Sequence, residues 1–214
     1  MTESKRKRGR PASIDTQTAM RAVVELFRSK GYAAVSLDDL SEATGLSRPS
    51  LYRSFGNKLS MYLGAMDAFG RQVTNRAVPA LNAPGELQAA LANFFDAMLS
   101  IYYRDNDIAP GCLLFGTAPS SADVSAIQSR LKFGVEHLDA LMRARILRAA
   151  PNAHEAALET AVSLASNTLI AFSARAKSGA TKSELVTMGT RCAKSVSSLL
   201  SAGSVNFEGS EPER

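Results

Sequence analysis

Two short helical stretches separated by three residues place the tightest limit on how this chain can fold. Ser36 begins a capping box, with a carboxylate three residues later, and Gly45 ends the helix that it starts. Ser47 then caps a second short helix, which begins at Arg48. So short a connection forces a sharp angle between the two helices. The spacing therefore predicts a helix-turn-helix over residues 36–56.

Further helices are predicted on both sides of this motif. Ser13 or Asp15 can cap a helix that ends at Gly31, and Asn57 can cap a longer helix that begins at Lys58. The chain contains 34 Ala and 23 Leu, against 28 Val, Ile and Thr together. Because Ala and Leu favour helices and β-branched residues do not, the composition predicts an all-α fold.

Turn-forming residues divide the remainder of the chain into segments of helical pattern. The predicted helices are 86–103, a short one from Cys112, 124–149, 152–178 with Asn152 as its cap, and 182–200.

The net charge of +5 lies in the first quarter of the sequence. Residues 1–58 carry 11 basic and 6 acidic side chains, whereas residues 59–214 carry 14 of each. A basic segment attached to a neutral body is typical of a protein that meets a polyanion.

Several classes of protein are excluded by what the sequence lacks. No run of 18 apolar residues is present, and no apolar stretch follows the basic N-terminus, so we expect neither a membrane span nor a secretory signal. Two cysteines and two histidines, in no metal-binding spacing, predict a cytoplasmic protein without a metal or other cofactor. The basic region has no carboxylate pair, nucleophile constellation or glycine loop beside it, so we do not expect an enzyme.

The N-terminal arm carries Arg6, Arg8 and Arg10, and its segment Arg8-Gly9-Arg10-Pro11 resembles an AT-hook. Glycine lets such a backbone lie in the minor groove of DNA, where flanking arginines meet a strong negative potential. The alternative is a solvated basic tail without a partner.

Long polar donors are concentrated on the predicted third helix and beside it. Arg48 and Arg53 can reach guanine edges or phosphates, Pro49 can contact a thymine methyl, and Tyr52 has a hydroxyl suited to phosphate. The alternative is that the arginines are solvated surface charges. The candidate DNA-binding residues of the two helices and their flanks are Ser36, Ser47, Arg48, Pro49, Ser50, Tyr52, Arg53 and Lys58.

Residues 14–66, taken together, resemble the N-terminal domain of the TetR family of transcriptional regulators; Leu59, where members commonly carry Glu, is a departure. The resemblance implies an all-helical homodimer that binds a pseudo-palindromic DNA operator, and an unidentified small-molecule effector that releases the DNA. The matching residues are Phe27, Gly31-Tyr32, Ser36-Leu37, Ala43-Thr44-Gly45-Leu46-Ser47, Ser50-Leu51-Tyr52, Phe55 and Asn57-Lys58.

We therefore expect a three-helix helix-turn-helix DNA-binding domain followed by a helical ligand-binding and dimerisation domain. The expected boundaries are a basic flexible arm (1–12), the helix-turn-helix domain (13–60), the helical domain (61–200) and a disordered tail (201–214).

Two groups of apolar residues in the second domain are candidates for the implied dimer and ligand contacts. Apolar steps of three and four along the last two helices favour a dimer seam, although the same pattern suits a monomer core. The seam candidates are Leu158, Val162, Ala165, Leu169, Leu185, Met188 and Val196. The ligand-binding candidates, each of which could instead be plain core, are Phe94, Met98, Tyr102, Cys112, Phe115, Phe133 and His137.

Cys112 permits a narrower hypothesis, because a cysteine at a helix N-terminus has a lowered thiol pKa and reacts as a thiolate. The alternative is a small buried hydrophobic residue. The sequence thus favours a ligand-responsive repressor; a thiol-based sensor and an effector-independent architectural DNA-binding protein remain as alternatives.

Overall fold

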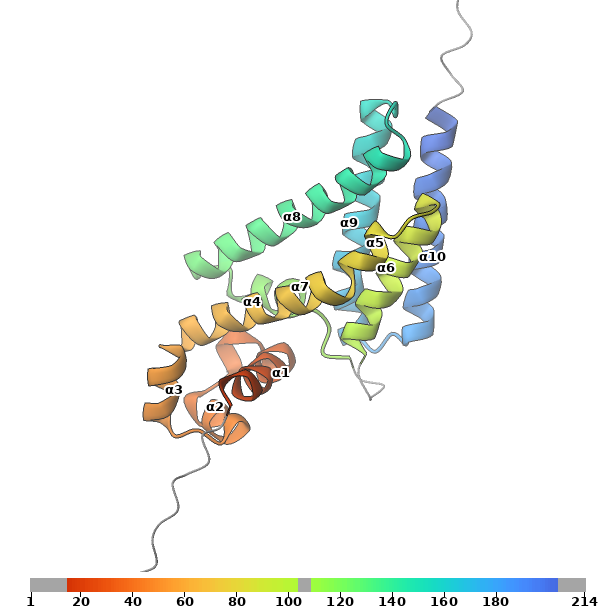
Figure 1. Ribbon diagram of the computed structural model, residues 1–214. Coiled ribbons are helices and arrows are strands. Elements are labelled where there is room, and N and C mark those ends of the chain that lie inside the picture. The colour runs from red at the N-terminus through yellow and green to blue at the C-terminus, as the bar shows by residue number, and fades with distance from the viewer. Residues whose placement is uncertain (1–14, 104–108, 204–214) are drawn as a thin grey trace, which may run out of the picture.

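A computed structural model of the chain describes residues 15–103 and 109–203, and these residues form helices and no β-strand (Figure 1). The α-helices are α1 (Thr16–Ala34), α2 (Leu37–Thr44), α3 (Arg48–Phe55), α4 (Lys58–Arg76), α5 (Val78–Asn82), α6 (Leu87–Tyr102), α7 (Leu113–Thr117), α8 (Ser125–Ala149), α9 (Glu155–Lys177) and α10 (Lys182–Gly203), with a 3₁₀ turn at Ala118–Ser121.

The helices form two groups joined by α4. Helices α1 to α3 lie together at one end of the molecule, which we call the head, and α4 leads away from them (Figure 1). Helices α6, α9 and α10 pack side by side at the other end, and α8 packs against α9. We call the part formed by α5 to α10 the body.

The predicted caps of the head are confirmed. The Asp15 carboxylate accepts the first backbone N–H groups of α1, and the capping box at Ser36 is closed in both directions. Gly45 ends α2 in the left-handed conformation, with φ +68°. Ser47 and Asn57 cap α3 and α4 as expected. Because five separate signals agree, the path of the chain through the head follows from local sequence alone.

The structure corrects three helix ends. Backbone helicity of α1 breaks at Gly31, where φ is +79°, but one more turn follows to Ala34. His154, rather than Asn152, caps α9, because the imidazole Nδ1 accepts the Ala156 N–H at 3.3 Å. Helix α10 continues through residues 201–203, which were expected in the tail. The rest of that tail and the arm at residues 1–12 lie outside the described residues.

The core of the head continues into the body through Tyr62 of α4. Its ring packs edge-on against Phe27 of α1, with centroids 4.9 Å apart, and its hydroxyl pairs with the Thr117 hydroxyl at 2.6 Å. Both aromatic side chains are fully buried. One continuous apolar core therefore holds the head against the body.

The capping box at Ser36 gives a stability test. Ser36→Ala removes the hydroxyl that accepts the Asp39 N–H, and loss of such a cap costs about 1 kcal/mol in the free energy of unfolding. We expect this loss in urea denaturation. Ser54→Ala, at an exposed position inside α3, is the matched control and should change stability by less than about 0.5 kcal/mol. Equal effects of the two changes would contradict the assigned cap.

Candidate functional site

Helix α3 lies on the surface of the head and turns its polar side chains outward. Leu51 is fully buried and anchors the helix, whereas Arg48, Pro49 and Arg53 are exposed. Tyr52 is 47% exposed, which is unusual for a large aromatic side chain in a single chain and provides a contact surface. The predicted direct readers thus share one accessible face, as an element that enters a DNA groove requires.

Two of the three predicted serine contacts, Ser36 and Ser47, have hydroxyls that are already engaged in caps, and the Ser50 hydroxyl is bonded to Ser47 and Arg53. Ser36 Oγ donates to Asp39 Oδ2 at 2.6 Å, and Ser47 Oγ donates to Ser50 Oγ at 3.0 Å. Hydrogen bonds from Lys30 and then from Ser36 hold the pKa of the Asp39 carboxyl well below its usual range. A phosphate here would therefore meet the remaining backbone N–H groups of the first helical turns rather than free serine hydroxyls.

Arg48, the first predicted reader, is paired within the protein. Its Nε and Nη2 donate to Asp38 Oδ1 of α2 at 2.9 and 2.5 Å. The Asp38 hydrogen bonds raise the pKa of the Arg48 guanidinium. Both side chains are more than half exposed, so the pair is weak and a DNA base or phosphate can compete for the guanidinium.

Lys58 also has partners on the head. Its Nζ donates to the Ala33 carbonyl at 3.2 Å and lies 4.8 Å from the centroid of the Tyr32 ring. The side chain of Lys58 begins at the start of α4, and these contacts fix its ammonium beside the last turn of α1. A fixed cation at a helix N-terminus suits a phosphate. The arm arginines Arg6, Arg8 and Arg10 lie outside the described residues.

A cavity of about 380 Å³ lies in the body beside α4. Most of its lining is apolar, which suits a small organic molecule. At one place Asp67 of α4 and Arg130 of α8 form an ion pair at 3.0 Å. The predicted residues among the lining are Phe94, Met98, Cys112, Phe115, Phe133 and His137.

Two of the predicted ligand-binding residues differ from expectation. Tyr102 does not line the cavity, and its ring is fully buried elsewhere in the core of the body. Phe133 lines the cavity but is 60% exposed, and it stacks on His137 with ring centroids 5.9 Å apart. This stacked pair therefore lies where the cavity meets solvent.

Cys112 does not have the surroundings of a reactive thiolate. It caps α7, and its Sγ accepts the Phe115 N–H at 3.4 Å, as a helix N-terminal position predicts. However, only 3% of the residue is exposed, and burial raises the pKa of the thiol. Desolvation of the thiolate outweighs the helix N-terminus, so the expectation of a lowered pKa is wrong.

The residues expected at a dimer seam belong to the core of the single chain. Helices α9 and α10 pack against each other and against α6, so the apolar repeat marks the face that they bury there. Met188 is only half-buried. Six of the seam candidates are already buried within the single chain: Leu158, Val162, Ala165, Leu169, Leu185 and Val196.

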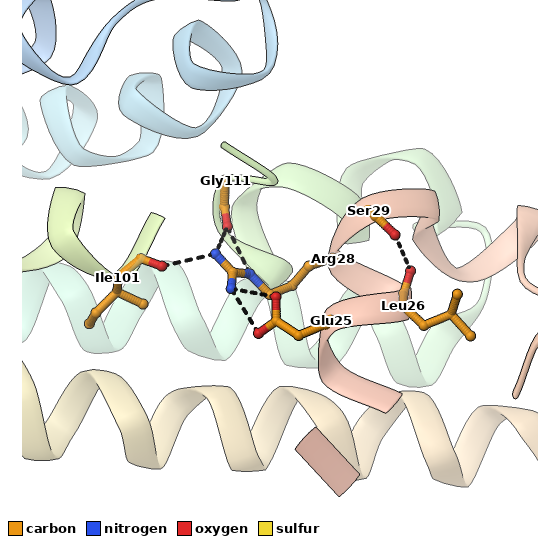
Figure 2. Close-up of polar contacts among 6 residues, drawn as sticks. All are labelled: Glu25, Leu26, Arg28, Ser29, Ile101 and Gly111. Carbon is orange, nitrogen blue, oxygen red and sulfur yellow. Dashed lines mark hydrogen bonds and ion pairs between the residues drawn. The ribbon is translucent and has the colours of Figure 1, made fainter. Parts of the chain in front are cut away.

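Arg28 of α1 was not predicted, yet it joins the head to the body (Figure 2). Its guanidinium is fully buried and donates to the Gly111 carbonyl at 3.1 and 2.8 Å and to the Ile101 carbonyl at 3.1 Å. Its remaining Nη1 donates to both oxygens of Glu25 at 3.1 Å. The sequence does carry a signal: Arg28 follows Val24 by four residues and so falls on the buried face of α1.

In the described part of the chain, no three His, Cys, Asp or Glu side chains are grouped as a metal site would need. Among the same residues, no helix has both the length and the apolar character to cross a membrane.

Comparison with known proteins gives matches at both the sequence and the fold level. Residues 19–65 match the family "Bacterial regulatory proteins, tetR family". The transcriptional repressor ComR of Escherichia coli is 31% identical over 126 residues, which are 56% of this chain and 60% of ComR. The regulator YezE of Bacillus subtilis is 29% identical over 51% of this chain and 56% of its own length. The chain thus spans less than two thirds of these relatives.

Solved structures share the fold over most of the chain. A cysteine mutant of the TetR family regulator CifR, complexed with a 26-base-pair operator, has a TM-score of 0.75 at 23% identity and covers 87% of this chain and 98% of its own. A regulator from Chloroflexus aurantiacus has a TM-score of 0.70 at 23% identity, covering 85% and 94%.

The pair between Arg48 and Asp38 yields a prediction for DNA binding. Asp38→Asn removes a negative charge from the face of α3 and releases the guanidinium, so affinity for a DNA duplex should rise several-fold at low salt. Fluorescence anisotropy measures this change. Glu155→Gln removes a carboxylate that pairs with Arg143 at 3.3 Å in the body, and it should leave the affinity unchanged. Weaker binding by Asp38→Asn would show instead that Asp38 positions Arg48.

Proposed function

We propose that the chain, whose residues 19–65 match the tetR family of bacterial regulatory proteins, is a transcriptional repressor that binds operator DNA as a homodimer. The family is one of DNA-binding regulators and not of enzymes. The observation that supports the proposal most directly is the exposed face of α3, where arginine, proline and tyrosine side chains stand on a helix anchored by Leu51.

In this proposal α3 reads base edges in the major groove, while the starts of α2 and α4 contact phosphates. A two-fold operator requires two reading helices about 34–36 Å apart, or a multiple of that distance. In the same proposal residues 13–60 bind DNA, and residues 61–200 hold the ligand and the second subunit. The basic arm adds contacts in the minor groove.

We propose further that an apolar effector enters the cavity and releases the DNA. The cavity lies against α4, the helix that also leaves the head, so a ligand there can favour a conformation in which the two heads are wrongly spaced. Burial of Cys112 favours this interpretation over a thiol-based sensor. The cavity itself favours it over an architectural DNA-binding protein, which needs no effector.

The roles of Arg48 and Lys58 can be separated on a duplex selected from a random-sequence pool by the wild-type chain. Arg48→Ala should weaken binding to that duplex roughly tenfold or more and relax the base preference, because a base contact is lost. Lys58→Ala should weaken selected and scrambled duplexes alike and lower the salt dependence, because a phosphate contact is lost. Binding curves at several salt concentrations test both. A selected pool without a palindrome would contradict the operator model.

The homodimer can be tested on the outward face of α9. Leu164 is 38% exposed, and its exposed neighbours Thr160, Ser163 and Asn167 carry short, uncharged side chains that let a second helix approach. Leu164→Glu places a charge on this face and should convert the dimer to a monomer in light scattering. Leu147→Glu, on the exposed side of α8, is the control and should leave the dimer intact. A dimer that survives Leu164→Glu would place the interface elsewhere.

A further inference from the structure

The buried guanidinium of Arg28 meets the cavity wall as well as the body backbone. Its Cζ lies 5.1 Å from the centroid of the Phe69 ring, and Phe69 lines the cavity. Its acceptor Gly111 directly precedes Cys112, which lines the cavity as well. One part of the lining, Phe69 on α4, therefore contacts Arg28 directly, and a second part, Cys112 before α7, is bonded covalently to the acceptor Gly111.

Gly111 is held in place from the opposite side by α9. A Cβ atom at this residue would come within 2.9 Å of Ser173 Oγ and 3.1 Å of the Ser173 carbonyl oxygen, and its φ of +71° also favours glycine. The next residue, Cys112, donates its N–H to Ser173 Oγ at 3.0 Å. The Gly111 carbonyl is therefore fixed between α9 and Arg28, and it cannot shift without moving one of them.

We propose that Arg28 is the positioning residue that couples occupancy of the cavity to the orientation of the head. The inference rests on the proposed function, because it supplies the link between ligand and DNA. Every N–H group of the Arg28 guanidinium already has an acceptor. If the Gly111 carbonyl moves, either α1 moves with it, or the buried N–H groups of Arg28 lose this acceptor. Lost hydrogen bonds inside a core are costly, so α1 follows and carries α2 and α3 with it.

The test measures the coupling directly, with the full chain, a selected duplex and a fluorescent probe. The probe is 1-anilinonaphthalene-8-sulfonate, whose aromatic body suits an apolar cavity. Its dissociation constant is measured with and without saturating duplex. By linkage, the ratio of the two constants equals the factor by which the probe weakens DNA binding. For the wild-type chain we expect a ratio of at least about fivefold.

Arg28→Lys retains the charge but cannot reproduce the forked contacts, so the ratio should fall to less than about twofold. The chain offers a matched control in Arg145 of α8, which is also buried and donates to two backbone carbonyls, those of Leu81 and Gly85, at 2.9 Å each. Arg145→Lys should lose comparable stability in urea and keep the wild-type ratio. A merely structural role for Arg28 would make the two variants alike.

A second measurement needs no probe. Gly70 lines the cavity, and a Cβ atom there would meet nothing within 4 Å, so Gly70→Phe can fill the cavity from α4. This change should weaken duplex binding at least about fivefold in the wild-type background and less than about twofold in Arg28→Lys. If Arg28→Lys does not fold, Glu25→Gln weakens the same guanidinium contact more mildly and should give an intermediate ratio.

The outcomes separate the inference from the function on which it rests. If the probe does not weaken duplex binding by the wild-type chain, and if the Gly70→Phe variant binds the duplex as tightly as the wild type, ligand-induced release itself is contradicted. If the wild-type chain shows the expected ratio of probe dissociation constants, and if Arg28→Lys and Glu25→Gln show the same ratio, only the role of Arg28 is overturned.

Discussion

Because α4 serves both the head and the body, its contact with α1 determines where the exposed face of α3 stands relative to the cavity. Tyr62 makes this contact, packed against the rings of Phe27 and Tyr32 and hydrogen-bonded to Thr117. Aromatic side chains packed edge-on in a core add specific geometry to ordinary burial, and a buried hydroxyl needs a partner. The head is thus attached to α4 through a packed aromatic contact, and the core of its small helices continues into the body.

The head could be predicted almost completely from the sequence, because its helix boundaries are encoded locally. Asp15, Ser36, Ser47 and Asn57 each accept backbone N–H groups within a few residues, and Gly45 ends α2 in the left-handed conformation, so no knowledge of the tertiary structure is needed. His154 shows the limit of this reasoning. An imidazole caps helices rarely, and Asn152 two residues earlier is the more common choice, so only the tertiary structure identifies the start of α9.

Sites that depend on packing between distant segments were harder to predict. Apolar periodicity identified the inner faces of α9 and α10. The same periodicity is expected whether the partner is α6 or a second subunit, so it cannot identify the partner. In the structure both helices pack against α6. Cys112 illustrates a competition between two effects. Its position on α7 favours a thiolate and its burial opposes one, and burial prevails because the side chain is enclosed. Fractional exposure of a side chain is not encoded in its neighbours along the chain.

The acceptors that Arg28 uses in the body are both main-chain oxygens, those of Ile101 and Gly111. A change of side chain at Met98, Phe115 or His137 alters the shape and polarity of the cavity without removing either oxygen. The shape of the cavity and the attachment of α1 therefore depend on different atoms. A descendant of this chain could change what the cavity accepts by exchanging a few lining residues, while α1 keeps the same attachment to the body.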